Sequence, residues 1–181
     1  MRKSCVEDCQ NLFDKFKISF TGKEAIEVGG NDIVSLDDVI SPNPLIALCP
    51  GIVLLDKGFN VDTMGASTNL QVDFLDYKSI APLENKFDLV FTFDTLEHIP
   101  NPFLFCENLI NVTKPGGYIY LSTVFSYGYH PSPEDYYRFS PKGLSEVFSN
   151  QYNKNFDKCI QLYSGWGSDP RGVEILCRKK K

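Results

Sequence analysis

The sequence contains no apolar run near 18 residues, which is the length that a membrane-spanning helix needs. The first ten residues, MRKSCVEDCQ, lack the apolar stretch of a secretory signal peptide, so we expect a cytoplasmic protein. A broad basic surface is also lacking, because the net charge is −5 and the one basic cluster is residues 178–181. These absences argue against a membrane protein, an exported protein and a nucleic-acid-binding protein.

The six cysteines are scattered, and no second Cys or His pair with metal-ligand spacing accompanies Cys5 and Cys9. Because a structural zinc ion needs about four ligands, we expect no metal site. Without a secretory signal, the thiols are expected to be reduced and mainly structural. Cys5 and Cys9 are four residues apart and should share one helix face. The cysteines are Cys5, Cys9, Cys49, Cys106, Cys159 and Cys177.

The composition is that of a globular protein, with 43% hydrophobic and 23% charged residues in 181 positions. This length predicts a single domain. We expect an N-terminal helix within residues 1–20 and a core formed by residues 21–181.

Apolar runs alternate with helical patterns along the chain. We predict strands at residues 25–28, 51–56, 70–75, 87–93, 118–124, 159–163 and 173–177. We predict helices at residues 4–17, 102–113 and 141–149. Strands that are apolar throughout, with helices between several of them, indicate a buried and largely parallel sheet. The fold class is therefore α/β, doubly wound.

Acidic residues follow the predicted strands. Glu27, Asp56, Asp76 and Asp94 each lie at or just past a strand end. In doubly wound sheets, ligands bind outside the carboxyl ends of the strands. These four acids therefore predict a ligand site at that edge.

The stretch AIEVGGND, residues 25–32, follows this pattern with a carboxylate and two glycines. Glycines after a first strand allow a tight turn and let a ligand approach the backbone. The G-x-G-x-x-G spacing of a dinucleotide site is absent, and Glu27 and Asp32 would repel a pyrophosphate. S-adenosylmethionine carries a sulfonium and an ammonium group, and both favour a nearby carboxylate. The turn therefore favours this cofactor.

Two further acids fit the same cofactor. Asp56 ends the second strand, where a carboxylate can accept from both hydroxyls of a ribose. Asp76 follows the third strand and could accept from an adenine amino group, while the backbone N–H of Tyr77 meets a ring nitrogen. Asp73 is the competing candidate, because the third strand could end two or three residues earlier.

The segments KFDLVFTFDTLEHIPNP (86–102) and KPGGYIYLSTV (114–124), in this order, resemble class I S-adenosylmethionine-dependent methyltransferases of the small-molecule branch. The segment HPSPEDYYRFSPKGL (130–144) is similar to one found in a methyltransferase-domain subgroup. The resemblance covers residues 24–148. It implies a single methyltransferase-like domain with a Rossmann-like, mostly parallel seven-stranded sheet, an antiparallel last strand and a three-layer sandwich.

The resemblance also implies cofactor contacts by position. Glu27, Gly29 and Gly30 would line the methionine and ribose side, and the backbone carbonyls of Thr92 and Phe93 would meet the methionyl amine. The remaining implied residues are Asp56 for the ribose and Asp76 with Tyr77 for the adenine. The sequence departs from the family pattern at Asn31 and Ile33, where further glycines are usual. We interpret Ile33 as the beginning of the first helix.

Residues 127–139 (YGYHPSPEDYYRF) combine aromatic and charged side chains between the fifth strand and the next helix. His130 is the candidate catalytic base for a hydroxyl acceptor, because histidine titrates near neutral pH. His98, Asp135, Tyr136 and Arg138 are the candidate substrate-binding residues. Two alternatives stay open: Arg138 could instead form an internal ion pair with Asp135 or Glu134, and His98 could be a cap or packing residue.

The expected function is methyl transfer from S-adenosylmethionine to a small molecule, with an oxygen or nitrogen acceptor. A first alternative is an inactive methyltransferase-like binding or partner protein, which the departures Asn31 and Ile33 support. A second alternative is an NAD(P)-dependent oxidoreductase, which Glu27 and the missing glycine motif oppose.

Overall fold

The structure is a computed structural model that describes residues 3–30, 33–36, 39–56, 68–131, 134–166 and 169–181. The first half of the chain forms α1 (Lys3–Lys15), β1 (Ala25–Val28), β2 (Ile33–Leu36), β3 (Val39–Pro42), α2 (Pro44–Leu48), β4 (Val53–Asp56), β5 (Thr68–Gln71), α3 (Tyr77–Ile80) and η1 (Ala81–Leu83). The second half forms β6 (Phe87–Phe93), η2 (Leu96–His98), α4 (Pro102–Val112), β7 (Thr113–Val124), α5 (Pro141–Asn155), β8 (Phe156–Trp166) and β9 (Asp169–Lys179).

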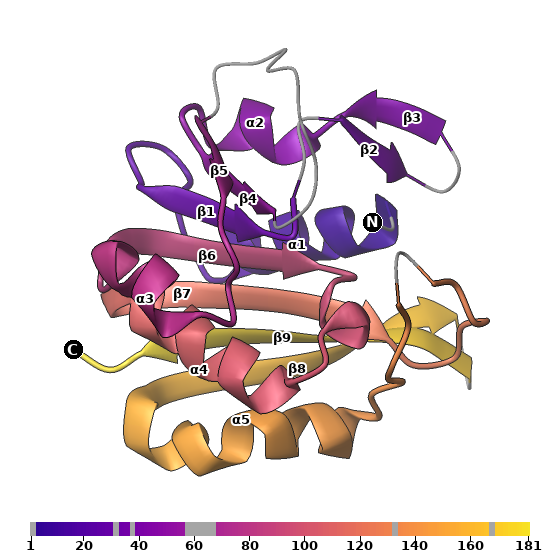
Figure 1. Ribbon diagram of the computed structural model, residues 1–181. Helices are drawn as coiled ribbons and strands as arrows, with labels where there is room; N and C mark the ends of the chain where they lie inside the picture. The colour runs from indigo at the N-terminus through magenta and orange to yellow at the C-terminus, as the bar shows by residue number, and fades with distance from the viewer. Residues whose placement is uncertain (1–2, 31–32, 37–38, 57–67, 132–133, 167–168) are drawn as a thin grey trace.

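Seven strands form one sheet in the order β5-β4-β1-β6-β7-β9-β8 (Figure 1). The pairs β4–β5, β1–β4, β1–β6 and β6–β7 are parallel, while β9 runs antiparallel to β7 and β8. The predicted fold class is confirmed, including the antiparallel last strand.

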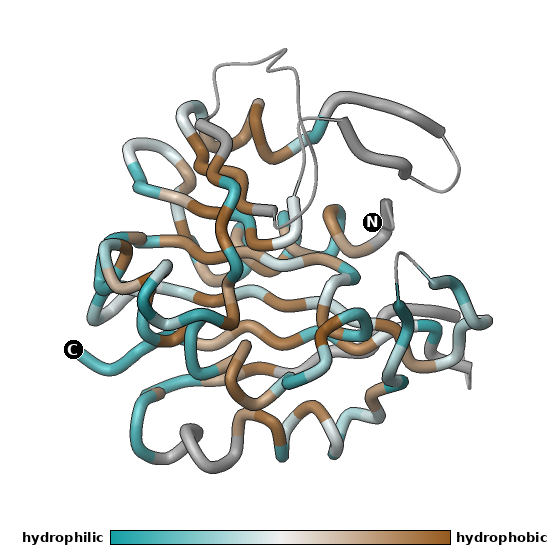
Figure 2. The backbone as a smooth tube through the Cα atoms, viewed as in Figure 1, coloured by the Kyte–Doolittle hydropathy of each residue, from teal (hydrophilic) through white to brown (hydrophobic). Residues whose placement is uncertain are grey.

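Helices cover both faces of this sheet (Figure 1). Along β6, Val90 belongs to the core under α4 and α5, whereas Leu89 and Phe91 belong to the core on the α1 and α2 side. Because neighbouring side chains of a strand point to opposite faces, a strand buried on both faces is apolar throughout. Figure 2 accordingly shows the central strands mostly in the hydrophobic colour. The three-layer arrangement is confirmed.

Helix α4 begins and ends where its residues predict. Asn101 Oδ1 accepts a hydrogen bond from Leu104 N at 3.1 Å, and Pro102 occupies the first turn, where its missing N–H costs nothing. Helix α5 begins at Pro141 as predicted but continues to Asn155, past the expected end at residue 149.

The segment after β1 is not a helix. Ile33 begins β2, which pairs antiparallel with β3, so the interpretation of Ile33 as the first helical residue is wrong. The physical reason is the content of β-branched residues in IVSL and VISP, which favour strands. Asn31 lies outside the described residues. Asn43 follows β3 directly and caps α2.

The third strand of the sheet lies earlier than predicted. Strand β5 ends at Gln71, whereas the sequence predicted residues 70–75. Asp73 Oδ1 accepts from Leu75 N at 3.0 Å, which closes a turn after the strand. Asp76 then caps α3.

Two cysteines are joined. Cys159 and Cys177 lie opposite each other in the β8–β9 register and form a disulfide. The expectation that all six thiols are reduced is therefore wrong for this pair, because the antiparallel register brings the two side chains together. Cys5, Cys9, Cys49 and Cys106 are buried and form no disulfide. Among the described residues, no helix has both the length and the apolar character needed to cross a bilayer.

Candidate functional site

The carboxyl ends of the parallel strands meet at one edge of the sheet, to the right in Figure 1. The segments that follow these strands contain the predicted site residues. They are the glycine turn after β1, Asp56 at the end of β4, residues 72–76 after β5, residues 94–98 after β6, and residues 125–140 after β7.

The turn after β1 requires glycine at two successive positions. Gly29 has φ of 83°, and its N–H donates to Leu55 O at 2.7 Å, which ties β1 to β4. A Cβ on Gly29 would lie 2.6 Å from Thr95 Cγ2 and would overlap Oγ1 of the same residue. A Cβ on Gly30 would lie 2.5 Å from Glu27 Oε2. The turn therefore brings the backbone close to the side chains that follow β1 and β6.

Glu27 is a buried carboxylate at this turn, with 1% of its surface exposed. Its Oε2 accepts a hydrogen bond from Asn43 Nδ2 at 2.6 Å. Burial raises the pKa of Glu27 to about 7, against the smaller opposing effect of the Asn43 hydrogen bond. A nearby positive charge would favour the ionised form. The sequence prediction did not include Asn43, whose Oδ1 also accepts from Leu45 N.

The two acids proposed to contact adenine have different positions in the structure. The Asp76 carboxylate accepts from Lys78 N at 3.2 Å and Ser79 Oγ at 2.7 Å, so it is used as the cap of α3. Asp73 lies two residues past the end of β5. Tyr77 is exposed at the start of α3. Asp56 is the last residue of β4, beside Gln71, and its side chain lies outside the described part of the chain.

The end of β6 approaches the glycine turn. Thr92 is buried, and its Oγ1 has no hydrogen-bond partner among the described residues. The Phe93 carbonyl accepts from Thr95 Oγ1 at 3.0 Å. Asp94 has φ of 45°, a left-handed conformation that non-glycine residues adopt at a cost and that is found often at functional sites.

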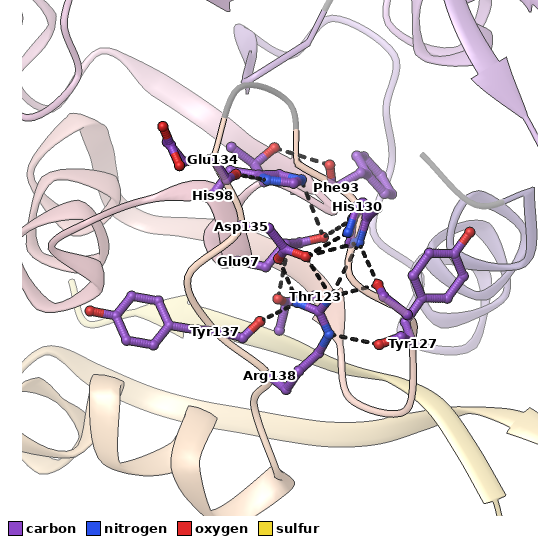
Figure 3. Close-up of polar contacts among 12 residues, drawn as sticks. Phe93, Glu97, His98, Thr123, Tyr127, His130, Glu134, Asp135, Tyr137 and Arg138 are labelled. Atoms are coloured by element: carbon purple, nitrogen blue, oxygen red, sulfur yellow. Dashed lines mark hydrogen bonds and ion pairs between the residues drawn. The ribbon is translucent and has the colours of Figure 1, made fainter.

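Glu97, His98 and His130 form a cluster beside this strand end (Figure 3). The Glu97 side chain is fully buried, and its Oε2 accepts from Thr123 Oγ1 at 2.9 Å. Its Oε1 lies 3.9 Å from His98 Nε2 and 3.7 Å from His130 Nε2. The cluster therefore joins η2, β7 and the segment after β7.

Arg138 holds the segment after β7 in place through an internal ion pair. Its guanidinium donates to both oxygens of Asp135, at 2.5 and 2.6 Å, and to the carbonyls of Tyr127 and Gly128 (Figure 3). The Arg138 guanidinium holds the pKa of Asp135 well below its usual range. Asp135 Oδ2 also accepts from His130 N at 2.8 Å. Of the alternatives for Arg138, the internal pair with Asp135 is the one present.

Tyrosines contact the cluster through a ring or through the backbone. The backbone N–H groups of Tyr136 and Tyr137 donate to the Glu97 carbonyl at 2.8 and 3.2 Å, while the Tyr136 ring is 49% exposed. The His130 ring lies edge-on to the rings of His98, at 5.0 Å, and Tyr127, at 4.9 Å. The predicted residues His98, His130 and Tyr136 are thus neighbours.

The sequence prediction did not include Glu97 and Thr123 in the site. The adjacent residues Glu97 and His98 in LEHIP are the signal that could have placed Glu97 in the site. The Glu97 carboxylate is buried among the side chains of His98, His130 and Thr123.

Comparison with known proteins gives the family. The model of the family described as "Methyltransferase domain" matches residues 7–165. A ubiquinone biosynthesis O-methyltransferase from Shewanella pealeana is 27% identical over 119 residues, which cover 63% of this chain and 49% of that protein. The mitochondrial protein of the same description from Arabidopsis thaliana is 28% identical over 58% of this chain and 33% of its own. The chain thus spans half or less of the length of these curated relatives.

Solved structures share the fold. A SAM-dependent methyltransferase from Archaeoglobus fulgidus superposes with a TM-score of 0.65 at 12% identity, over 96% of this chain and 94% of its own. The 1,6-didemethyltoxoflavin-N1-methyltransferase of Burkholderia thailandensis, solved with its substrate and S-adenosylhomocysteine, gives a TM-score of 0.66 at 12% identity, over 99% and 79%.

The family implies S-adenosylmethionine as methyl donor, and the residues present fit this cofactor. The buried Glu27 carboxylate suits a cationic group, and the two glycines keep the backbone beside it free of side chains of their own. With the matched residues and the strand order, the chain belongs to the class I S-adenosylmethionine-dependent methyltransferase family.

Proposed function

We propose that the protein transfers a methyl group from S-adenosylmethionine to a small molecule bound beside Glu97, His98 and His130. The observation that carries this proposal is the placement of two features at one edge of the sheet. These are the buried carboxylate of Glu27 beside its glycine turn and the cluster around Glu97. Thr95 connects them, because it contacts the turn and directly precedes η2.

In this proposal the chain binds the cofactor through the strand ends. Glu27 places a negative charge near the sulfonium and ammonium groups, and the carbonyls of Thr92 and Phe93 accept from the amine. Asp56 accepts from the ribose hydroxyls. We assign the adenine contact to Asp73 rather than Asp76, because Asp73 lies nearer the end of β5, while Asp76 caps α3 through both of its carboxylate oxygens.

The acceptor is proposed to lie against residues 127–138. S-adenosylmethionine supplies an already activated methyl group, so the chain contributes mainly by aligning the two reactants and excluding water. Alignment of this kind can supply roughly 7–11 kcal/mol in ideal cases. His130 is the residue proposed to activate a hydroxyl acceptor, and His98 and Tyr136 border the same space. Arg138 and Asp135 act by holding the segment in place.

The acceptor class follows from the surface around the cluster. Tyr127 and Tyr136 are both about half exposed there and offer flat faces that suit a molecule containing a ring. The curated relatives are described as O-methyltransferases of ubiquinone biosynthesis, which supports an oxygen acceptor in this chain as well. The net charge of −5 continues to argue against nucleic acid.

Calorimetric titration with S-adenosylmethionine and S-adenosylhomocysteine tests the cofactor assignment. We expect micromolar binding by the wild-type protein. Loss of a hydrogen bond to a charged group costs about 1.5–3 kcal/mol, so Glu27→Gln should weaken binding about 10–100-fold. Glu107→Gln, an exposed change on α4, serves as the control and should bind normally. Equal affinity of the Glu27 variant would remove this residue from the cofactor site.

The role of His130 is tested separately. His130→Ala should lower kcat with a turned-over acceptor about 100-fold or more, since positioned acid–base groups contribute about 10²–10⁴-fold. The dissociation constant for S-adenosylhomocysteine should stay within about twofold. An unchanged kcat would exclude His130 from activation of the acceptor.

One observation favours a second candidate, a methyltransferase-like protein that binds a ligand or partner without catalysis. The hairpin β2–β3 stands where the helix after β1 was expected. The titration above separates the two functions, because the non-catalytic candidate predicts no micromolar binding of S-adenosylmethionine. A thermal-shift assay with NAD and NADP addresses the oxidoreductase alternative, and no shift is expected.

A further inference from the structure

The only two histidines of the sequence, His98 and His130, meet at one buried carboxylate. One follows β6 and the other follows β7, and Glu97 lies between their rings (Figure 3). We propose that Glu97, His98 and His130 form a binding site for one divalent transition-metal ion.

The spacing of the ligand atoms fits such an ion. Glu97 Oε1 lies 3.9 Å from His98 Nε2 and 3.7 Å from His130 Nε2, and the three atoms all lie within 4.8 Å of one another. Nitrogen and oxygen ligands at about 2.0–2.2 Å in tetrahedral geometry stand about 3.3–3.6 Å apart. Movements of a few tenths of an ångström bring Glu97 Oε1 to this distance from each ring, and rotations that move the two histidine nitrogens together by about 1 Å complete the site.

Both histidine rings have the orientation of metal ligands. His98 Nδ1 lies 2.5 Å from the Glu134 carbonyl oxygen, and His130 Nδ1 lies 3.0 Å from the Gly128 carbonyl oxygen. A carbonyl only accepts, so a proton on Nδ1 suits both rings and leaves the lone pair of Nε2 facing Glu97. At His130, Asp135 Oδ2 at 3.4 Å from Nδ1 favours this tautomer, whereas the contact with Arg138 Nη2 at 3.3 Å opposes it. Metal-bound histidines typically donate their other N–H to such a carbonyl.

A hydrogen bond also fixes the orientation of the Glu97 carboxylate. Thr123 Oγ1 donates to Glu97 Oε2 at 2.9 Å, which leaves Oε1 as the atom that faces both rings. Three electron-pair donors, two nitrogens and one oxygen, therefore point at a common position. The Arg138 guanidinium already interacts electrostatically with this fully buried carboxylate, and a divalent ion would add positive charge directly between Oε1 and the two rings.

A proton alone explains the geometry less well. A protonated imidazole bonded to a carboxylate would place nitrogen and oxygen about 2.7–2.9 Å apart. The observed separations of 3.7 and 3.9 Å exceed this range for both rings. The gap between the three side chains is the one an ion would fill.

Two histidines and one carboxylate bind zinc, iron(II) and related ions and leave coordination positions open. The His130 side chain is 32% exposed, so the open positions face the acceptor side of the cluster. Resting on the proposed function, the ion binds the acceptor oxygen and lowers the pKa of its hydroxyl. The proton leaves to water, the oxygen bonds to the methyl carbon, and the carbon–sulfur bond breaks. The acceptor class is then a hydroxyl compound, and His130 acts through the ion.

Titration of the untagged, metal-stripped full chain with Co²⁺ tests the site, read from visible absorption and from calorimetry. We expect one Co²⁺ per chain and visible bands in a low-symmetry site. Glu97→Gln and His130→Gln should each weaken Co²⁺ binding about tenfold or more, which is the lower bound seen even for outer partners of metal ligands. Glu134→Gln is the matched control, because it removes a carboxylate from the same segment but keeps the carbonyl that accepts from His98.

The possible outcomes are separable. Absence of Co²⁺ binding to the wild-type chain, or equal losses in Glu134→Gln and Glu97→Gln, would overturn the metal site. Because Glu97 is buried, its variant is compared with His130→Gln, whose partly exposed site tolerates the change. Titration of the same preparations with S-adenosylhomocysteine tests the proposed function independently. Co²⁺ binding without cofactor binding would keep the metal site and reject the methyl transfer.

Discussion

At the scale of single residues, substitutions at Gly29 and Gly51 distinguish the cost of a left-handed backbone from the cost of steric overlap. Gly29 and Gly51 have almost the same φ, 83° and 85°, in the region that side chains rarely adopt. A Cβ on Gly51 would meet nothing within 4 Å, whereas a Cβ on Gly29 would overlap the side chain of Thr95. A substitution at position 51 therefore measures the cost of the left-handed backbone conformation alone.

This pair gives a quantitative expectation. Gly51→Ala should lower the free energy of unfolding by about 1–2 kcal/mol, the cost of a left-handed conformation for a residue with a Cβ. Gly29→Ala should cost about 1–3 kcal/mol more, because overlap with Thr95 adds the penalty of overpacking. Urea unfolding of both variants measures the difference. Equal losses would mean that Thr95 moves aside without cost and does not hold the turn.

Glu27 shows how one residue links fold and ligand. The hydrogen bond from Asn43 ties the end of β1 to the beginning of α2. The same carboxylate is the charge proposed to attract the cofactor. Burial makes ionisation of this carboxylate costly, and a cationic ligand would lower that cost in the proposed complex.

At the scale of elements, residues 125–140 depend on one ion pair. Arg138 uses its planar group to bind both oxygens of Asp135 and the carbonyls of Tyr127, Gly128 and Tyr137, which closes the segment on itself. Asp135 in turn holds the backbone of His130. The segment therefore positions His130 as a unit.

We expect Arg138→Lys to loosen this unit, because lysine keeps the charge but loses the bidentate geometry. A hydrogen bond between charged groups is worth about 1.5–3 kcal/mol, so amide exchange in residues 127–138 should become about tenfold faster or more. Arg178→Lys is the matched control, since Arg178 binds Asp157 in the same bidentate way on β9 and β8. Equal exchange in the wild type and Arg138→Lys would contradict the role given to the pair.

The pairing of β8 with β9 makes a separate prediction. Alkylation of the denatured, unreduced chain should modify four cysteines, because Cys159 and Cys177 are joined. Reduction before alkylation should raise the number to all six. Mass spectrometry of the intact chain counts the added groups. Six modified cysteines without reduction would show that the bridge is absent from the purified protein.

The elements also show what a sequence can predict. Strands β1 and β6 are predicted to the residue and α4 to within one residue, because apolar runs and the N-terminal proline are local signals. The hairpin β2–β3 escaped prediction because a doubly wound sheet usually continues from its first strand into a helix, and Ile33 was interpreted accordingly.

The site residues also differ in whether their signal in the sequence is local. Glu27 and the glycine turn were predictable, since a residue's position after a strand is encoded locally. The contact of Glu97 with His130 was not, because it depends on the path that Asp135 and Arg138 impose on the segment after β7. The Cys159–Cys177 bridge likewise depends on the register of two distant strands.

At the scale of the whole molecule, the pH dependence of stability results from acids whose pKa values are shifted in opposite directions by folding. Hydrogen bonds to Arg138 lower the pKa of Asp135, and ion pairs lower those of Asp88 and Asp157. These acids stabilise the folded chain above their ordinary pKa. Their contribution is lost as the pH falls from that value towards the lowered pKa of the folded state. Glu27 acts the other way, because burial raises its pKa.

The sign for Glu27 predicts a decline of stability towards neutral pH. Between its ordinary pKa of 4.5 and its folded value of about 7, the folded state binds more protons than the unfolded state. The free energy of unfolding therefore decreases as the pH rises, in total by on the order of 3 kcal/mol at 1.36 kcal/mol per pKa unit. Below this range Glu27 is protonated in both states and contributes no such cost.

Urea unfolding between about pH 5 and pH 8 measures this decline. Glu27→Gln should remove most of it, because an amide does not titrate, whereas the exposed change Glu107→Gln should leave the slope as in the wild type. Saturating S-adenosylmethionine should also flatten the profile, since its positive charge favours ionised Glu27 in the folded state. A wild-type slope that persists in Glu27→Gln would assign the decline to other groups and separate the buried acid from cofactor binding.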